Sequence, residues 1–415
     1  MVAAACSDHS GSSPSASTSP TATTRPRRHG FGPTTTAPSA RPDGHGRSYT
    51  VPAAIAADCS KDVTAGLQAW LDRLPDDVTA ELGSEGCYRI EGTVVFADRH
   101  DVTVEGNGAT LKATTVGFGG RLSRRQRSQL SVVNSEHITV RDLFVRGANP
   151  RAGVGVGVAA YQPEFEAQHA FSLHGDDGVT LDRVQASDVY GDFVYIGGTG
   201  STPSRNVTVT RSRFARSGRQ GISITDADGV LIAGNEITDV RRSVFDLEPN
   251  KRADEVRHIR IENNRTGRAV NYWLADKGSG VNVGDVMVSR NVMQAPTGAL
   301  VIVAGPAFGK RGPFTFLDNV LWTTGGVSDE SAAGAFLFSN AAGVRLNGNA
   351  VRIAPAARLA GVELRNTSGV IVRDNRFTGA TTAVVSDAAS RNVSVSPPPS
   401  TSTSEPKSSS STSAG

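Results

Sequence analysis

The sequence has few aromatic residues, few sulfur-containing residues and no long apolar run. Only 6% of its 415 residues are aromatic and 38% are hydrophobic, and it contains three methionines and three cysteines. This composition is too thin for several ordinary hydrophobic cores. No run approaches the roughly 20 consecutive apolar residues of a membrane-spanning helix. The net charge of +3, from 43 basic and 40 acidic side chains, gives no reason to expect a nucleic-acid partner.

Glycine, by contrast, is abundant and occupies 45 positions. Glycine, asparagine and aspartate flank many short Val and Ile pairs, a pattern typical of short strands joined by tight turns. We therefore expect an all-β fold. Ser, Thr, Pro and Gly dominate both ends of the chain, which cannot bury enough apolar surface to fold. The predicted organisation is a disordered tether over 1–47, one folded domain over 48–395 and a disordered tail over 396–415.

The three cysteines indicate the compartment. Cys59 and Cys87 bracket the first segment of the folded domain, and we predict a disulfide between them, with two buried free thiols as the alternative. Cys6 follows VAAA and precedes a Ser/Thr-rich stretch, which resembles the lipidation site of a bacterial lipoprotein. The five residues before Cys6 do not contain the basic and hydrophobic segment of such precursors. We expect a secreted or lipid-anchored extracellular protein that meets a membrane only through the lipid.

One short phrase of alternating apolar and polar residues occurs ten times. Its copies begin at positions 101, 137, 178, 206, 229, 258, 285, 313, 343 and 369. Alternation is typical of a half-buried strand, and intervals of 23 to 41 residues are typical of a solenoid. Seven copies carry asparagine at the same offset: Asn107, Asn235, Asn264, Asn291, Asn319, Asn349 and Asn375. If the coils stack about 4.8 Å apart, these amides can bond to one another in a ladder.

This organisation resembles the pectin-lyase-like superfamily of extracellular polysaccharide enzymes, over roughly residues 50 to 395. The resemblance implies a single-stranded, right-handed parallel β-helix. Val63, Leu67, Trp70 and Leu71 follow helical spacing, and a short helix there would cover the open edge of the first coil.

The catalytic motifs of the superfamily are matched less clearly than its repeat pattern. HGDDG at 174–178 resembles the paired aspartates of polygalacturonases, but Asp176 and Asp177 directly precede a repeat copy, so we assign them to a turn. The histidine-bearing turn of the same enzymes is Arg219, Gln220 and Gly221 here, without histidine. The WIDH signature of pectate lyases does not occur.

Two insertions interrupt the repeat, at 117–130 and 148–171, and insertions in a solenoid often line a binding groove. The first is basic, with four arginines: Arg121, Arg124, Arg125 and Arg127. The second is rich in glycine and then carries polar residues: Tyr161, Glu164, Glu166 and His169. The alternative is that both are surface loops with incidental charges.

A second strand precedes most repeat copies, and its outward side chains should form two columns. The first column is predicted to contain Ser172, Tyr195, Ser223, Asp246 and Trp273. The second is predicted to contain His174, Gly197, Thr225, Glu248 and Ala275. Just before these strands come four polar residues: Asp192, Arg219, Gln220 and Arg242. This polar and aromatic patch is the candidate site.

Catalytic roles are assigned to Asp192, Asp246, Glu248 and Arg219. Asp246 and Glu248 should lie about 7 Å apart on one strand, with Asp192 on the order of 10 Å away. These separations leave room for water between an acid and a base, as in inverting glycosidases. The alternative is that the charges only form salt bridges along the solenoid.

Substrate contacts are assigned to the neighbouring side chains. Tyr195 and Trp273 could stack on sugar rings, and Arg242, together with Arg219, could bind a uronate carboxylate. His174 and His169 could transfer protons. A calcium ion on the three carboxylates is chemically reasonable, but no coordination set is evident.

The leading hypothesis is a monomeric extracellular β-helix enzyme that cleaves an acidic polysaccharide by lyase or hydrolase chemistry. The alternatives are a non-catalytic β-helix that binds glycans as a surface adhesin, and a uronate epimerase.

Overall fold

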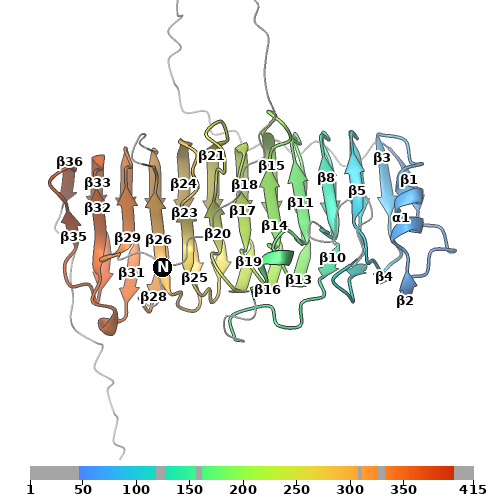
Figure 1. Ribbon diagram of the computed structural model, residues 1–415, viewed down its shortest axis with the longest axis horizontal. Coiled ribbons are helices and arrows are strands. Elements are labelled where there is room, and N and C mark those ends of the chain that lie inside the picture. The colour runs from blue at the N-terminus through green and yellow to red at the C-terminus, as the bar shows by residue number, and fades with distance from the viewer. Residues whose placement is uncertain (1–45, 118–126, 156–160, 307–310, 326–331, 397–415) are drawn as a thin grey trace, which may run out of the picture. The chain divides into compact units, whose positions relative to one another are not determined.

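The computed structural model describes residues 46–117, 127–155, 161–306, 311–325 and 332–396. In this part of the chain the strands form three parallel sheets of 13, 12 and 11 strands, called sheets A, B and C below (Figure 1). Successive strands enter sheets C, A and B in turn, and each strand pairs with its counterpart one coil away. The predicted parallel β-helix is confirmed.

Sheet A contains β1 (Arg47–Thr50), β3 (Val78–Glu81), β6 (Val102–Glu105), β9 (Thr139–Arg141), β12 (Thr180–Asp182), β15 (Ser204–Thr210), β18 (Ala227–Ala233), β21 (Glu255–Glu262), β24 (Asn282–Ser289), β27 (Phe314–Leu317), β30 (Val344–Asn347), β33 (Ser368–Arg373) and β36 (Arg391–Ser396). Sheet B contains β2 (Asp58–Asp62), β4 (Cys87–Arg89), β7 (Thr110–Lys112), β10 (Phe144–Arg146), β13 (Gln185–Val189), β16 (Arg213–Ser217), β19 (Glu236–Val240), β22 (Arg265–Thr266), β25 (Val292–Met293), β28 (Val320–Thr323), β31 (Ala350–Ile353) and β34 (Arg376–Thr378).

Sheet C contains β5 (Val94–Ala97), β8 (Leu130–Val133), β11 (Phe171–His174), β14 (Val194–Gly197), β17 (Ile222–Ile224), β20 (Phe245–Leu247), β23 (Tyr272–Asp276), β26 (Ala299–Ala304), β29 (Gly334–Ser339), β32 (Ala360–Arg365) and β35 (Val384–Ser386). Three short helical segments complete the described elements: α1 (Thr64–Leu71), η3 (Pro163–Phe165) and η4 (Pro355–Ala357).

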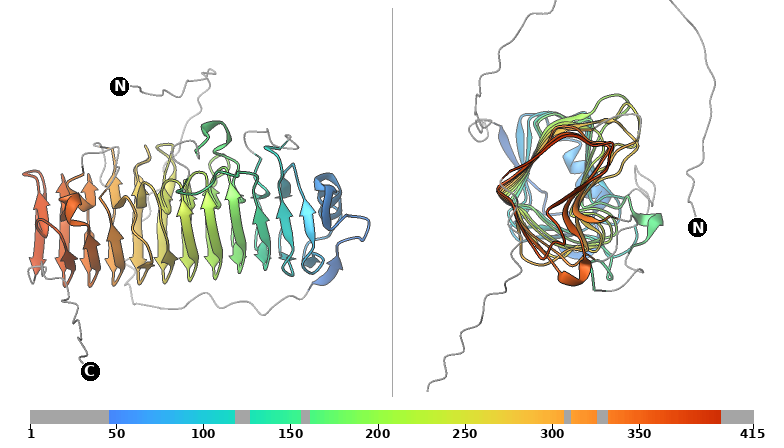
Figure 2. Two further views of the ribbon diagram at one scale, coloured as in Figure 1. Left: turned by 90° about the horizontal axis from the view of Figure 1, so that it is seen from below. Right: turned by 90° about the vertical axis from the view of Figure 1, so that its left-hand side faces the viewer.

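The core is a continuous apolar column enclosed by the three sheets. In β15, for example, Val207 and Val209 are buried, whereas Thr208 and Thr210 between and after them are half-buried on the outer face. The same alternation recurs along the stack, and Figure 2 shows the coils superimposed when they are viewed along it. The narrow Val, Ile, Leu and Phe core explains why so few aromatic residues suffice for a chain of this length.

Six of the seven predicted asparagines form the ladder at the turn between sheets A and B. The Nδ2 of Asn235 donates to Oδ1 of Asn264, 3.0 Å away, and the same bond continues coil by coil through Asn291, Asn319 and Asn349 to Asn375. The backbone N–H of each of the first five also donates to the next amide oxygen. These amides are buried, so the ladder removes an otherwise unfavourable burial of polar groups.

Asn107 is not part of this ladder, and that prediction is wrong. Its side chain is exposed, its φ is 53°, and its Nδ2 donates to the carbonyl of Leu82. The ladder ends at Ser212, whose backbone N–H donates to Asn235 Oδ1. In the coil before it the equivalent residue is Val184, which has no side-chain amide and donates only its backbone N–H, to Ser212 Oγ. A shared sequence offset therefore does not guarantee a shared environment.

The predicted helical cap is α1, at the first end of the stack (Figure 1). Leu67, Trp70 and Leu71 are buried in the core, and Gln68 faces β5, the first strand of sheet C. The Gln68 side chain accepts from the Val95 N–H at 2.7 Å and donates to the Val95 carbonyl at 2.9 Å. One amide side chain thus satisfies backbone groups of an edge strand that has no neighbour on that side.

The predicted disulfide between Cys59 and Cys87 is present. It connects β2 to β4, the first two strands of sheet B. Cys6, Arg121, Arg124 and Arg125 lie outside the described residues. None of the helices in the described ranges is long and apolar enough to cross a membrane.

Candidate functional site

The predicted patch lies on the outer face of sheet C. In the observed register, Ser172, Tyr195, Ser223 and Asp246 occupy one row on successive strands, as predicted. In the second row His174 pairs with Gly197. Side chains of this row also include Thr225 and Glu248, which follow the ends of β17 and β20.

Trp273 does not belong to this face, and the prediction that it faces outward is wrong. The pairing of β20 with β23 places Ala275, not Trp273, beside Asp246. Trp273 and Leu274 are both buried in the main core, so two successive residues point inward and the alternation shifts by one. The indole packs edge-on against Phe245 and donates from Nε1 to Thr266 Oγ1 at 3.1 Å. It cannot stack on a sugar.

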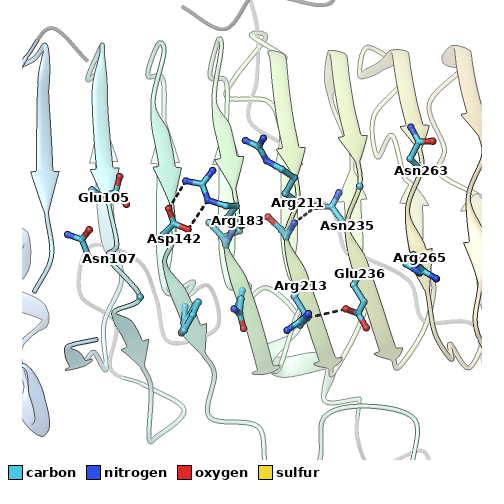
Figure 3. Close-up of a pocket in the computed structure, with 16 residues that line it drawn as sticks. Glu105, Asn107, Asp142, Arg183, Arg211, Arg213, Asn235, Glu236, Asn263 and Arg265 are labelled. Carbon is cyan, nitrogen blue, oxygen red and sulfur yellow. Dashed lines mark hydrogen bonds and ion pairs between the residues drawn. The ribbon is translucent and has the colours of Figure 1, made fainter. Parts of the chain in front are cut away.

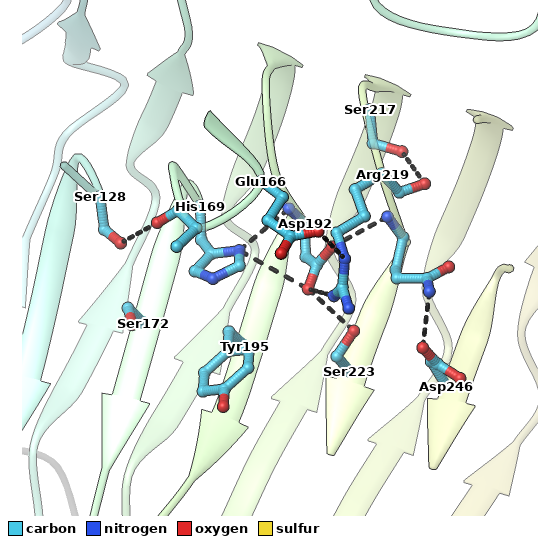
Figure 4. A network of polar contacts seen from close by, with 12 residues as sticks. Ser128, Glu166, His169, Ser172, Asp192, Tyr195, Ser217, Arg219, Ser223 and Asp246 are labelled. Carbon is cyan, nitrogen blue, oxygen red and sulfur yellow. Dashed lines mark hydrogen bonds and ion pairs between the residues drawn. The ribbon is translucent and has the colours of Figure 1, made fainter. Parts of the chain in front are cut away.

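Asp192 is enclosed at the entrance to β14. Its side chain is fully buried, and Oδ1 accepts from the Gln220 backbone N–H at 2.9 Å. Oδ2 accepts from Arg219 Nη1 at 2.9 Å and from Ser223 Oγ at 2.8 Å (Figure 4). With both oxygens occupied and no exposure, this carboxylate positions its neighbours instead of reaching a substrate.

Arg219 lies at the centre of the charged groups. Besides Asp192 it contacts Glu248, with Nη2 2.8 Å from Oε2, and Glu166, with Nε 3.5 Å from Oε2. Burial lowers the pKa of the guanidinium, but the charges of Asp192, Glu248 and Asp246 outweigh it and hold that pKa well above the ordinary value. Arg219 is therefore permanently charged and is already engaged by carboxylates of its own chain.

Asp246 is a buried carboxyl next to an ionic pair. It is 5% exposed, and Oδ2 accepts from Gln220 Nε2 at 2.6 Å. Gln220 is itself held, because its Oε1 accepts from the Ser243 N–H at 2.6 Å. Burial and the adjacent Glu248 charge raise the pKa of Asp246 well above its usual range, although Arg219 opposes the shift. Sequence reasoning gave Gln220 no role, although it precedes β17 by the same two positions by which Asp192 precedes β14.

His169 and Tyr195 form a stacked pair beside Asp192. Their ring centroids are 4.8 Å apart, and His169 Nδ1 accepts from the Asp192 backbone N–H at 3.0 Å. The proton of the neutral ring therefore lies on Nε2. Burial lowers the pKa of His169 to about 4, so the ring stays neutral at physiological pH. Tyr195 is partly exposed, and its hydroxyl accepts from Thr225 Oγ1 at 3.0 Å.

His174 lies in the second row beside these groups. Its Nε2 is 2.7 Å from Ser172 Oγ, and its ring centroid is 5.3 Å from that of Tyr195. Burial lowers the pKa of His174. Asp176, two residues further on, accepts from the backbone N–H groups of Ser135 and His174, consistent with the turn role assigned to it.

The two insertions reach the site differently. In the described end of the second insertion, the Tyr161 hydroxyl donates to Glu166 Oε2 at 2.5 Å, and the Arg242 guanidinium lies 5.2 Å from the Tyr161 ring centroid. Arg242 thus contacts the insertion. In the first insertion, Arg127 is fully buried and donates to Gln168 Oε1 at 3.0 Å, so it does not line a groove.

Metal binding finds no support in this arrangement. Among the described residues, no group of three or more His, Cys, Asp or Glu side chains is placed to hold a metal ion. Asp192, Asp246 and Glu248 accept bonds from Arg219, Gln220 and Ser223 instead. The hollow at the turn between sheets A and B is lined by none of the patch residues, whereas a smaller hollow adjoins the patch at Gly175 and Asp176, directly after His174.

Comparison with known proteins identifies the fold. Residues 131–307 match the family described as a right handed beta helix region. No curated protein matches the chain. The polygalacturonase from Erwinia carotovora ssp. carotovora superimposes with a TM-score of 0.57 at 13% identity, over 87% of this chain and 98% of that chain.

Two other similar structures are a bacterial surface adhesin and a bacteriophage gene product. The surface protein and adhesin PfbA of Streptococcus pneumoniae gives a TM-score of 0.53 at 12% identity, over 84% of this chain and 98% of that chain. The pre-mature gene product 12 of bacteriophage phi29 gives 0.54 at 14% identity, over 82% of this chain and 50% of that chain. Likeness at such identities concerns the fold alone. This chain is a right-handed parallel β-helix with the fold of the pectin-lyase-like proteins.

Proposed function

We propose that the protein hydrolyses an acidic polysaccharide on the outer face of sheet C, at Asp246 and Glu248. The observation that carries the proposal is a buried carboxyl with a strongly raised pKa two residues from a carboxylate paired with arginine. Two neighbouring carboxyl groups whose surroundings separate their pKa values are typical of a catalytic acid and base.

Asp246 would act as the general acid. The Gln220 N–H points at Oδ2, so that oxygen is an acceptor and the carboxyl proton belongs on Oδ1. With its pKa raised by burial, Asp246 holds this proton more strongly than an ordinary carboxyl and can donate it to the glycosidic oxygen of the leaving group.

Glu248 would act as the general base. Its side chain is 31% exposed, Arg219 holds Oε2 at 2.8 Å, and among the described residues no hydrogen bond occupies Oε1, which can take a water molecule. Residues two apart on a strand share a face at about 7 Å, a spacing compatible with a water between the two carboxyl groups and with inversion. Tyr195, two strands from Asp246 in the same row, and His174 on the strand beyond it provide an aromatic surface for a sugar ring further along this face.

Hydrolysis is favoured over elimination by the state of Arg219. A lyase or epimerase needs a cation that neutralises the uronate carboxylate before the C5 proton is removed. Arg219 is bound by Asp192 and Glu248 and is 9% exposed, so it is not free for that task.

The second candidate is a non-catalytic glycan-binding surface. The 5% exposure of Asp246 favours it, because an acid must reach the leaving group. The fold likeness to an adhesin is compatible with it.

A panel of polysaccharides separates these functions. Hydrolysis produces reducing ends without absorbance at 235 nm, elimination produces both, and binding alone produces neither. Asp246→Asn should lower kcat by about 10²-fold to 10⁴-fold, the usual contribution of a general acid. Asp374→Asn, on an exposed turn, is the matched control and should retain full activity. Full activity of Asp246→Asn would overturn the assignment.

We also propose secretion, with or without a lipid on Cys6, and a monomeric protein. The Cys59–Cys87 disulfide supports an oxidising compartment. Mass spectrometry of the native protein tests the lipid: an unmodified Met1 would contradict processing at Cys6.

A further inference from the structure

An elongated groove follows the turn between sheets A and B, away from the site on sheet C. Its volume is about 690 Å³, and its lining comes from six successive coils, between Glu105 and Arg265. At about 4.8 Å per coil, the groove extends about 24 Å along the stack. These dimensions suit a segment of a linear polymer better than a compact small molecule.

Two parallel rows of residues border the groove (Figure 3). One row follows the ends of the sheet A strands: Asp142, Arg183, Arg211, Gly234 and Asn263. The other row is the first outward position of the sheet B strands, in register from coil to coil: Phe144, Gln185, Arg213, Glu236 and Arg265. Between the rows lie the buried side chains of Val184, Ser212 and Asn235. The concavity results from these inward residues and from the missing side chain at Gly234.

In the described ranges, the carboxylates of the groove all form ion pairs, whereas one of its arginines does not. Four arginines face three carboxylates, and all three carboxylates already pair with arginine: Glu105 with Arg141, Asp142 with Arg183, and Glu236 with Arg213. Arg265 is exposed, and among the described residues it has no ion-pair partner. Among its described residues the groove therefore presents one unpaired cation, Arg265, and no unpaired carboxylate.

The individual groups also have the chemistry of a saccharide site. Asp182 accepts from both Nε and Nη2 of Arg211 at 2.7 Å, which fixes that guanidinium and leaves Nη1 available. Phe144 is half-buried and can offer a ring face to a sugar. Arg213 and Arg265 lie two coils apart with Glu236 between them, so a ligand carboxylate can pair with Arg265 directly and compete with Glu236 for Arg213.

We infer that this groove is a second, non-catalytic binding site for a linear acidic glycan. The carboxylates of the glycan pair with Arg265 and Arg213, and one of its rings packs on Phe144. The site is independent of Asp246 and Glu248, so it can hold a polymer whether or not sheet C cleaves it.

A reporter placed in the groove tests the inference. Phe144→Trp puts a fluorophore at one end of the row, and the fluorescence of the wild-type protein supplies the background of its native tryptophans. Oligogalacturonate should produce a saturable change that weakens as salt rises, because exposed charges are screened. A neutral glucan oligosaccharide of equal length should bind at least about tenfold more weakly.

Three further variants on the Phe144→Trp background sharpen the test. Arg213→Gln combined with Arg265→Gln should weaken oligogalacturonate binding at least about tenfold. Glu236→Gln should strengthen it several-fold, because Arg213 loses the carboxylate that competes with the ligand; a merely structural Glu236 would not have this effect. Arg376→Gln is the matched control: Arg376 is exposed, in the same row four coils beyond Arg265 and outside the groove, and its loss should change affinity less than twofold.

Other outcomes would overturn the inference. They are no fluorescence change with oligogalacturonate, an equal loss in the Arg376→Gln variant, weaker binding by Glu236→Gln, or equal binding of the neutral oligosaccharide. Asp246→Asn should leave the fluorescence titration unchanged, so failure of the catalytic proposal and failure of this one are distinguishable.

Discussion

The outer face of sheet C differs between its two halves. In the first half the row of outward residues is polar: Ser131, Ser172, Tyr195, Ser223 and Asp246. In the second half the same row continues as Ala275, Ile302 and Leu337, which form a separate apolar cluster with Tyr272 outside the main core; Glu363 follows on the next strand. The strands pair through their backbones in both halves, so the side chains alone make one half a candidate site and the other an apolar patch.

Each half also contains a buried arginine, in a different place. Arg219 lies on the outside of the first half, among Asp192, Glu248 and Glu166. Arg311 lies in the second half, is fully buried, and pairs with Asp276, which occupies an inward position beside Leu247. The first arginine touches partly exposed carboxylates, whereas the second holds only buried groups and the carbonyls of Gly278 and Gly280. This contrast suggests a chemical role for the first arginine and a structural role for the second.

Removal of either arginine should have the largest effect on stability. Arg219→Met leaves Asp192 buried without its cation, and Arg311→Met does the same to Asp276; each should lower the free energy of unfolding by about 3–5 kcal/mol. Urea denaturation measures both. If Arg219→Met cost less than about 1 kcal/mol, the charged cluster would not be organised around this residue, and the contrast between the halves would weaken.

Truncations along the row should show an intermediate difference. Ile302→Ala removes a buried apolar side chain and should cost about 2–4 kcal/mol, whereas Ser172→Ala removes one hydroxyl bonded to His174 and should cost about 1 kcal/mol. Comparable costs, measured by thermal or chemical unfolding, would show that the two halves stabilise the stack in the same way.

The pH dependence of stability tests one buried carboxyl of the polar half, Asp176. Burial raises the pKa of Asp176 to about 7, against about 3.9 in an unfolded chain. Between these two pH values the folded state keeps a proton that the unfolded state has lost. The contribution of Asp176 to the free energy of unfolding is therefore fully present below about pH 4 and is lost as the pH rises to 7. The free energy of unfolding should fall by about 2–3 kcal/mol between pH 5 and 8. Asp176→Asn should remove this share of the slope and leave that of Asp276, whose pKa burial also raises to about 7; an unchanged slope would assign it to other groups.

Much of this fold could be predicted from local patterns. The alternation in the ten repeat copies correctly predicted the strands of sheet A, and the recurring asparagines predicted the ladder. The helical spacing around Trp70 predicted α1, and the positions of Cys59 and Cys87 predicted the disulfide. The exceptions are single-position events. Asn107 shares the offset but not the buried turn, and Trp273 enters the core because β23 places two inward residues in succession.

The candidate site was less predictable, because burial and partners depend on neighbouring coils. The sequence order brought Ser172, Tyr195, Ser223 and Asp246 into one row, since equivalent strands stack in register. It could not show that Asp192 is enclosed or that Gln220 binds Asp246, because both contacts join residues more than 25 positions apart. The groove near Arg265 was not foreseen, since its concavity depends on inward residues of several coils.

The sequence by itself determined that this protein is a stack of short coils with a narrow apolar core. Periodicity suffices for this, because each coil repeats the same local problem of burying alternate residues and closing a tight turn. Only the tertiary structure decided which polar side chains are accessible, which are paired and which carboxyl keeps its proton. Those properties arise from groups brought together across coils, where burial and nearby charge, not residue type, set the electrostatic free energy.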